Sequence, residues 1–337
     1  MEFLCFEIAN LEDFEFLGPK QGEVLIETFC SLVSPGTERA ILCGLPGMRH
    51  HFPHTPGYSA AGVVANVGKG VKVLKIGDRV AGMIHHASHE TVLPERLFKV
   101  PDGVSYEEAS FLMLGFVALQ GIRKARIVPG DRVVIIGQGL IGQISSRLAR
   151  LCGASKIIAV AATRNREKTA LLAGADEFLS LSEEQHWLRD VRADVVIEAA
   201  GTPQAVAIAC NCARENGRLS LIGSSRGLGR EVDVWELMQK KKLTVVGAHS
   251  STVPEKDASR SRWTYRQEGS LFLELLQTGR LTVSDLITWR ARPDDCNRVY
   301  EVLGDGGHEH VGIIFNWRED KGRPVSGGKN KPCSAMV

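Results

Sequence analysis

A glycine-rich turn between an apolar segment and a helical one constrains the fold of this chain more than any other feature. The segment 132–136 reads Arg-Val-Val-Ile-Ile, which has the apolar run of a buried strand. Beyond the turn, Ile144, Leu148 and Leu151 fall on one face of a helix. The turn itself has the spacing Gly-x-Gly-x-x-Gly, as Gly137-Gln138-Gly139-Leu140-Ile141-Gly142.

In this setting the spacing predicts a dinucleotide site. Gly137 permits a tight turn, Gly139 lets the backbone approach a pyrophosphate, and Gly142 lets helix and strand pack closely. The helix N-terminus would supply free N–H groups and a partial positive charge for the phosphates.

The sequence after residue 130 alternates apolar runs with helical segments. The runs carry too few polar residues for half-exposed strands, so we expect buried parallel strands in a doubly wound α/β sheet. These runs are Val133–Ile136, Ile157–Val160, Val195–Ile197, Leu219–Ile222 and Leu243–Val246.

The first hundred residues have a different pattern, with short strands separated by glycine and proline turns. Strands are expected over 23–28, 62–68 and from 78 onward, and Ser105 followed by acidic residues predicts a helical stretch towards Ala125. The tetrad Gly-Asp-Arg-Val occurs at Gly77–Val80 and Gly130–Val133. Because the surroundings differ, we expect two turn-to-strand starts and no internal repeat.

Composition limits the classes of partner. The chain of 337 residues suits two domains, and its formal net charge of +2, with no long basic run, argues against a nucleic-acid or membrane partner. The eight scattered cysteines and the acidic N-terminus, unlike a secretory signal, favour a cytoplasmic protein with reduced thiols. The polar segment 318–337 is expected to be a disordered tail.

The end of the second strand of the alternating region bears on the coenzyme. An NAD site would place Asp or Glu there, about twenty residues beyond the last glycine, to bind the ribose 2′-hydroxyl. A carboxylate close to a 2′-phosphate would cost about 4 kcal/mol, whereas guanidinium groups suit phosphate. The absence of such an acid favours NADP, with NAD as the alternative if the arginines are ordinary solvated residues. The strand end continues as Ala161, Ala162, Thr163, Arg164, Asn165 and Arg166.

Several segments together resemble the medium-chain dehydrogenase/reductase family. Pro56–Val64 with Gly77–Val80 is similar to its Gly-His-Glu-x-x-Gly-x-Val stretch and the following Gly-Asp-x-Val, and residues 97–103, 198–201 and 221–223 are similar to later segments. Short segments at 34–39 and 86–89 resemble the bacteriochlorophyllide hydroxyethyl dehydrogenase and related sugar or cyclitol dehydrogenases.

The resemblance implies a β-rich GroES-like catalytic domain over 1–120, completed by 286–317, and a Rossmann domain over 121–285. Substrate would bind in a cleft between the two domains, and a homodimer or tetramer is expected. Later strand ends would face the nicotinamide through Ala200, Gly201, Gly223, Ser224 and Ala248.

The zinc positions of the family are changed in this chain. Zinc members use a cysteine after an early strand, the histidine of Gly-His-Glu and often a second cysteine. The matching positions are Ser34, Tyr58 (with Ser59) and Leu114, none of which is a good zinc ligand. No cysteine lies between Cys43 and Cys152, so the structural-zinc lobe is missing too. We therefore expect catalysis without zinc.

A hydrogen-bonding acid or base would then manage the charge on the substrate oxygen. Tyr58 and His86 head the candidates, because a phenol can donate to a carbonyl oxygen and a neutral imidazole can move protons near pH 7. These residues also have structural interpretations. Tyr58 could fill space, and the histidines could lie in surface turns. Glu38 could form an ion pair with Arg39 or Arg79. Supporting groups are Ser34, Thr37, Glu38 and His89.

Two runs of the form His-His-x-x-His, at 50–54 and 85–89, are a rival interpretation, because they could build a replacement metal site. Neither run has the pattern of a helix on which two histidines would converge, and no cysteine stands beside them. Metal-free chemistry is therefore favoured.

Four functions follow, in order of preference. The first is an NADP-linked oxidoreductase that interconverts alcohol and ketone on a polar, polyhydroxylated small molecule, because the resemblance includes alcohol and polyol dehydrogenases and implies a polar, histidine-rich cleft. The residues of that cleft would be Ser34, Thr37, Glu38, Tyr58, His86 and His89. The second is a zinc-free enoyl or quinone reductase. The third is a non-catalytic NADPH-binding protein, and the fourth an epimerase that removes and returns a hydride.

Overall fold

The computed structural model describes most of the chain as two compact units. Unit 1 comprises residues 1–113 and 269–337, and unit 2 comprises residues 114–268. The borders expected from the sequence, 120/121 and 285/286, stay predictions. Within the described part of the chain, no helix is long and apolar enough to cross a membrane. The described residues are 9–14, 18–45, 53–184, 188, 190–224, 227, 229, 232–255, 263–306, 309–318 and 333–336.

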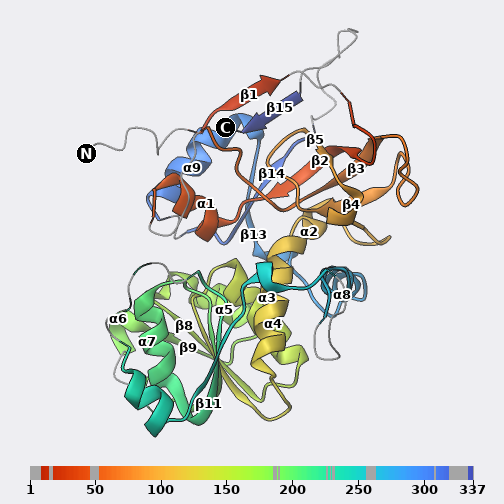
Figure 1. Cartoon of the computed structure of the whole chain (residues 1–337). Helices are drawn as coiled ribbons and strands as arrows, with labels where there is room; N and C mark the ends of the chain where they lie inside the picture. The colour runs from red at the N-terminus through yellow and green to blue at the C-terminus, as the bar shows by residue number, and fades with distance from the viewer. Residues whose placement is uncertain are drawn as a thin grey trace. The chain divides into compact units, whose positions relative to one another are not determined.

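Unit 2 is built on a six-stranded parallel sheet in the order β12-β11-β10-β7-β8-β9. Its strands are β7 (Arg132–Ile136), β8 (Lys156–Ala161), β9 (Glu177–Ser180), β10 (Ala193–Glu198), β11 (Ala213–Leu221) and β12 (Thr244–Gly247). Chain order reverses between β7 and β10, and helices lie on both sides of the sheet (Figure 1). The expected doubly wound α/β architecture is confirmed.

Apolar side chains explain why these strands form the centre of unit 2. Val133, Ile135, Val195 and Ile197 are fully buried, as expected for strands covered on both faces. Helix α4 packs Ile144 and Leu148 inward, but Leu151 at its last position is 37% exposed, so the expected apolar face ends one turn earlier. The helices of this unit are α4 (Leu140–Leu151), α5 (Glu167–Leu172), α6 (Leu181–Glu184) and α7 (Pro203–Cys212), with short turns η2 (Arg164–Arg166), η4 (Glu236–Lys240) and η5 (Ser250–Thr252).

Unit 1 is built on a mostly antiparallel sheet in the order β13-β14-β2-β3-β4-β6, with β5 paired to β2. The C-terminal strand β14 pairs with β2, where Ile314 lies opposite Leu32. The late part of the chain therefore completes a sheet begun near the N-terminus. The strands are β2 (Val24–Leu32), β3 (Ala60–Val67), β4 (Arg79–Gly82), β5 (His89–Val92), β6 (Leu97–Lys99), β13 (Ile287–Ala291) and β14 (Gly312–Asn316).

Local signals in the sequence explain several boundaries. Ser105 caps the helix after β6: its hydroxyl accepts the Glu108 N–H, and the Glu108 carboxylate accepts the Ser105 N–H. Both Gly-Asp-Arg-Val tetrads open strands, because β4 begins at Arg79 and β7 at Arg132. The remaining helices are α1 (Pro35–Leu42), α2 (Tyr106–Ala109), α3 (Leu112–Ala125), α8 (Tyr265–Gln277) and α9 (Cys296–Gly304), with short turns η1 (Pro94–Arg96), η6 (Ser284–Leu286) and η7 (Pro293–Asp295).

A separate two-stranded sheet joins the two ends of the chain. Strand β1 (Leu11–Phe14) pairs antiparallel with β15 (Cys333–Met336), and the two lie side by side in Figure 1. Strand β15 falls within the segment 318–337 that was expected to be a disordered tail. Over these four residues the structure has a strand, because their backbone groups find partners on β1.

Candidate functional site

The glycine turn of unit 2 has the geometry that its sequence predicts. Gly137 follows β7 with a φ of +90°, a conformation that favours glycine, and a Cβ there would lie 2.7 Å from the Ala200 nitrogen. A Cβ on Gly142 would lie 1.8 Å from the Gly137 carbonyl oxygen, so helix α4 could not pack at this distance with any other residue. A Cβ on Gly139 would meet one described neighbour within 4 Å, the Nη1 atom of Arg166 at 3.5 Å.

The two arginines after β8 differ in their surroundings. Arg164 forms ion pairs with Glu167 at 2.8 Å and with Glu183 at 2.7 Å, so carboxylates of this chain already neutralise its charge. Arg166 instead donates from Nη1 to the Gln138 carbonyl oxygen at 3.2 Å, beside the glycine turn. Ala162 and Thr163 are exposed at the strand end. Of these residues, Arg166 is the one that the structure brings to the turn.

The ends of β10 and β11 lie against the same turn. A Cβ on Gly201 would lie 3.2 Å from the Ser224 nitrogen, and one on Gly223 would lie 2.4 Å from the Gly201 nitrogen. The fully buried Glu198 carboxylate holds this region, because its Oε1 accepts the N–H groups of Ala200 (2.8 Å) and Gly201 (2.7 Å). Glu198 is missing from the predicted site; an acid at the end of an apolar strand is the signal that could have found it.

Ala248, the last residue predicted to face the nicotinamide, is buried directly after β12. Its N–H donates to the Leu221 carbonyl oxygen at 2.9 Å.

In unit 1, three predicted hydroxyl groups come together at the start of α1. The Ser34 and Tyr58 hydroxyl oxygens lie 2.7 Å apart in a hydrogen bond, and Thr37 also bonds the Tyr58 hydroxyl. Burial raises the pKa of Tyr58, and the negative charge of Glu38 raises it further, whereas the bonds from Ser34 and Thr37 lower it. On balance the pKa stays raised, so Tyr58 is a protonated donor at neutral pH.

The Glu38 carboxylate lies buried beneath these hydroxyls and accepts hydrogen bonds from separate segments of unit 1. It accepts the Ser34 N–H at 2.7 Å and the Tyr300 hydroxyl of α9 at 2.8 Å, and His86 Nε2 lies 3.2 Å away. The predicted alternative, an ion pair with Arg79, is not what the structure shows: the Arg79 guanidinium donates to the carbonyl oxygens of Pro101 (3.2 Å) and Val104. Three donors suit an ionised carboxylate.

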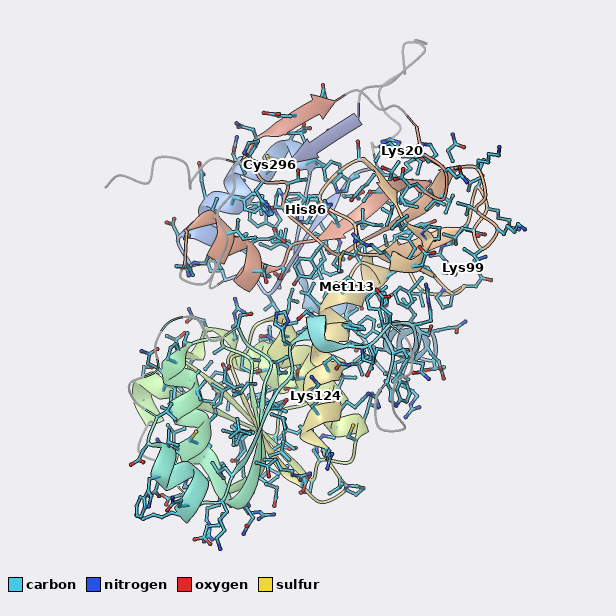
Figure 2. All side chains as sticks on the ribbon, viewed as in Figure 1. Lys20, His86, Lys99, Met113, Lys124 and Cys296 are labelled. Carbon is cyan, nitrogen blue, oxygen red and sulfur yellow. The ribbon has the colours of Figure 1, made fainter. Side chains whose placement is uncertain are left out.

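His86 lies in the interior of unit 1, where it is labelled in Figure 2, with 0% of its surface exposed. Its Nδ1 is 2.7 Å from the Ser31 hydroxyl, which also accepts the Trp317 indole N–H at 2.8 Å. An ionised carboxylate only accepts hydrogen bonds, so the proton of a neutral His86 lies on Nε2, which donates to Glu38. Nδ1 then accepts from the Ser31 O–H, whose oxygen has a lone pair for the indole N–H. His86 is therefore part of the buried hydrogen-bond network around Glu38, and it is not in a surface turn.

Gly57 explains why Tyr58 and His86 are neighbours. Its φ of +87° favours glycine, and a Cβ there would lie 2.7 Å from the His86 ring and 2.8 Å from the His86 nitrogen. The next residue but one, Ser59, turns away, because its hydroxyl donates to the Ser110 carbonyl oxygen and accepts the N–H of Met113, which is labelled in Figure 2.

The other histidines have different surroundings. His85 Nδ1 is 2.8 Å from Glu90, and His89 opens β5 opposite Glu27, with its Nδ1 3.3 Å from the Ser88 hydroxyl. His50 and His51 lie outside the described residues. Within the described residues, no three His, Cys, Asp or Glu side chains are grouped so as to hold a metal ion. Both ring nitrogens of His86 are engaged, by Ser31 and Glu38, and Nδ1 of His85 is engaged by Glu90.

Sequence reasoning missed Tyr300, Ser31 and Trp317. An aromatic residue at a helical spacing on α9 has the pattern of a core residue, and Tyr300 is indeed 3% exposed. Its hydroxyl partner lies far away along the chain, so no local pattern signals the contact.

Sequence comparison matches both units to known domain families. Residues 20–103 match the alcohol dehydrogenase GroES-like domain, and residues 141–263 match the zinc-binding dehydrogenase domain. The two matches together span more than half of the chain. The chain belongs to the medium-chain dehydrogenase/reductase family. It is accordingly an oxidoreductase with a GroES-like domain and a Rossmann-type domain.

Individual members of the family share only a modest fraction of their sequence with this chain. L-idonate 5-dehydrogenase of Vitis vinifera is 27% identical, over 78% of this chain and 79% of its own, and D-guloside 3-dehydrogenase of Shigella flexneri is 28% identical over 68% of each. The 2-methylene-furan-3-one reductase of Solanum lycopersicum is 31% identical over 54% of this chain and 50% of its own. The solved 2R,3R-butanediol dehydrogenase of Bacillus subtilis has the same fold, with a TM-score of 0.76 at 21% identity over 90% of this chain and 95% of its own.

The residues of this member do not fit the catalytic zinc of the family. Ser34 and Tyr58 offer hydroxyl groups that bond each other, and Leu114 is a buried apolar side chain. Zinc in proteins takes thiolate, imidazole and carboxylate ligands. The positions that match the family's zinc ligands therefore offer zinc none of its usual ligand atoms.

Proposed function

We propose that this protein is a zinc-independent, NADP(H)-dependent oxidoreductase that interconverts an alcohol and a ketone on a polar, polyhydroxylated small molecule by hydride transfer. The observation that carries the proposal is the Tyr58 hydroxyl, bonded by Ser34 and Thr37 above the buried Glu38 carboxylate. It offers a protonated phenol where zinc members have a metal ligand.

The proposed chemistry of Tyr58 follows from its surroundings. In carbonyl reduction the phenol donates its proton to the substrate oxygen as that oxygen gains charge. The Ser34 and Thr37 hydroxyls then donate to the phenolate, which limits the cost of the proton transfer. Burial, together with the negative charge of Glu38, keeps the phenol protonated beforehand. When bound, the nicotinamide coenzyme supplies or accepts the hydride.

The glycine turn fits a dinucleotide, because Gly139 has an open side where a backbone could approach a pyrophosphate. Two features support NADP: β8 ends on Ala161 and is followed directly by Ala162 and Thr163 instead of an acid, and Arg166 lies beside the turn. Among the coenzyme ligands predicted around Gly137–Gly142 and after β8, we propose Arg166 as the phosphate ligand, whereas Arg164 serves its ion pairs with Glu167 and Glu183.

The relatives support the substrate class. Two of the relatives are named as dehydrogenases of L-idonate and of a D-guloside. Both substrates are polyhydroxylated molecules in which a hydroxyl group is oxidised. The hydroxyl groups at Ser34, Thr37 and Tyr58 can bond such a substrate.

A panel assay with a Tyr58 variant tests the proposal. We expect purified protein to oxidise NADPH with sugar-derived ketones, and Tyr58→Phe to lower kcat/KM by about 10²- to 10⁴-fold with coenzyme affinity unchanged. Thr244→Ala, at an exposed position at the start of β12, is the control. Metal analysis of protein purified without a histidine tag is expected to find no zinc; one zinc per chain, or full activity in Tyr58→Phe, would sink the proposal.

A second candidate is an enone reductase, favoured by the likeness to the 2-methylene-furan-3-one reductase. It predicts NADPH oxidation with activated alkenes and none with ketones. The same panel separates the two, since only the first candidate requires turnover of ketones.

A further inference from the structure

The Gln143 side chain is a polar group that is fully buried. It lies in the first turns of α4 with 0% of its surface exposed, next to the glycine turn. Its Nε2 donates to the Gln138 carbonyl oxygen at 3.0 Å and to the Thr169 hydroxyl at 3.1 Å. Its Oε1 is buried without a hydrogen-bond partner in the described structure. A buried acceptor left unbonded destabilises a fold relative to an apolar side chain of similar size, so stability alone does not account for glutamine here.

These bonds form a closed ring that passes through Arg166. The Thr169 hydroxyl, which accepts from Gln143, donates to the Arg166 carbonyl oxygen at 3.0 Å. The Arg166 guanidinium in turn donates to the Gln138 carbonyl oxygen at 3.2 Å, the atom that also accepts from Gln143. Thr169 therefore holds the Arg166 backbone directly, and Gln143 holds the Gln138 carbonyl to which the Arg166 guanidinium donates.

The ring places one cationic group at the glycine turn and fixes its position. Arg166 Nη1 lies 3.5 Å from where a Cβ on Gly139 would be, whereas Arg164 is engaged by Glu167 and Glu183. Burial lowers the pKa of Arg166, so a bound phosphate would restore favourable surroundings for its charge. A guanidinium that is already held in place loses little conformational entropy when it binds phosphate. Its positioning therefore increases the affinity for the phosphate.

We propose that Gln143 and Thr169 are positioning residues that set the preference for NADP over NAD by holding the Arg166 guanidinium ready for the 2′-phosphate. This inference rests on the proposed function, specifically on its choice of coenzyme. It assigns the 2′-phosphate to Arg166 and leaves Arg164 to its carboxylate partners.

Fluorescence titration of the full-length protein with NADPH and with NADH tests the assignment without turnover. We expect Arg166→Ala to weaken NADPH binding by about 10- to 100-fold and NADH binding by less than about threefold. Arg164→Ala should change either affinity by less than about threefold. Equal weakening of both coenzymes by Arg166→Ala would overturn the proposal, because Arg166 would then contact the shared pyrophosphate.

The positioning role is tested by a matched pair at Thr169. Thr169→Val removes the hydroxyl at nearly constant shape and should weaken NADPH binding by about 3- to 10-fold, with NADH unchanged. Thr169→Ser keeps the hydroxyl and should restore the wild-type ratio. Gln143→Leu should act like Thr169→Val; if it fails to fold, the Thr169 pair decides. A wild-type ratio in Thr169→Val would refute the positioning role.

The two failures are distinguishable. If the wild-type protein binds NADH as tightly as NADPH, the proposed coenzyme is wrong and this inference falls with it. If the wild type prefers NADPH but the Gln143 and Thr169 variants keep that preference, only the inference is wrong.

Discussion

At the residue scale, Glu38 shows how one buried charge can organise several groups. Its acceptor positions are filled by Ser34, Tyr300 and His86, which come from the start of α1, from α9 and from the segment before β5. A buried carboxylate is costly unless it is hydrogen-bonded, so these donors are needed for the fold as well as for Tyr58.

Glu38→Gln should lower the pKa of Tyr58. Deprotonating Tyr58 next to Glu38 creates a second negative charge, so removing the first charge makes the phenolate easier to form. The variant should also lose about 1–3 kcal/mol of unfolding free energy, because an amide cannot accept all three bonds. A spectroscopic tyrosinate titration, corrected with Tyr58→Phe, measures the change.

Tyr300→Phe is the matched control, since it removes one bond to Glu38 and keeps the charge. It should leave the Tyr58 titration closer to wild type than Glu38→Gln does. An unchanged or higher pKa of Tyr58 in Glu38→Gln would contradict the electrostatic argument.

Gly57→Ala should destabilise the protein by about 1–3 kcal/mol or more. The substitution strains the backbone at a φ of +87° and drives a methyl group into the His86 ring and backbone. Gly36→Ala in α1 is the control, because a Cβ there meets nothing within 4 Å; it should be neutral or stabilise by up to about 1 kcal/mol. Chemical denaturation compares the two, and equal stabilities would show that the contact is harmless.

The sequence allows part of the residues around Glu38 to be predicted. Ser34, Thr37, Glu38, Tyr58 and His86 are found together, because the family resemblance places their segments in one domain. Their order within the cluster was not predictable: the sequence does not reveal that both His86 nitrogens are engaged. The contact of Tyr300 with Glu38 could not be predicted, because a contact between residues far apart along the chain leaves no local sequence pattern.

At the scale of elements, the turn before β5 is closed by a pair that responds to pH. Glu90 accepts the His85 N–H at 2.7 Å and bonds its ring at 2.8 Å. The bond to Glu90 raises the pKa of His85 above 6.5. This ionic contribution to stability is therefore complete below pH 6.5 and is lost as pH rises through the raised value.

Glu90→Gln should consequently lower Tm more at pH 6 than at pH 8. The effect should be about 1 kcal/mol or less, since the His85 side chain is 45% exposed. Lys99→Gln is the comparison, because it breaks the Lys99–Asp78 ion pair. The pKa of Asp78 is lowered below 3.8, so Asp78 is ionised at both pH values and Lys99→Gln should change Tm equally at pH 6 and pH 8. Thermal melts check both; a pH-independent Glu90→Gln effect would argue against the ion pair.

Elements were the best-predicted level. The buried strands of unit 2 follow from long apolar runs, which few other structures can accommodate. Strand β9 was missed, because Glu177-Phe-Leu-Ser is short and opens with a charged residue. Strand β15 was missed because a polar, glycine-rich segment gives no sign of a distant pairing partner.

At the scale of the whole molecule, the two units differ in how far apart their paired strands lie along the chain. In unit 2, β10 residue Val195 pairs with β7 residue Val133, whereas in unit 1 Ile314 pairs with Leu32. Distant pairings form slowly, because a long loop must close first. In refolding followed by pulsed hydrogen exchange, the amides of β7 and β10 should gain protection before those of β2 and β14. The reverse order would contradict this topological argument.

The position of β14 also matters while the chain is being synthesised. β14 lies between β13 and β2, so an interior strand of this sheet leaves the ribosome after every other strand of the same sheet. Until it emerges, β13 and the Cys30–Leu32 end of β2 present unpaired edges that can recruit strands from other chains. A transcript truncated before Gly312 should therefore yield an aggregating polypeptide rather than a shortened enzyme, even though every strand of the unit 2 sheet is present.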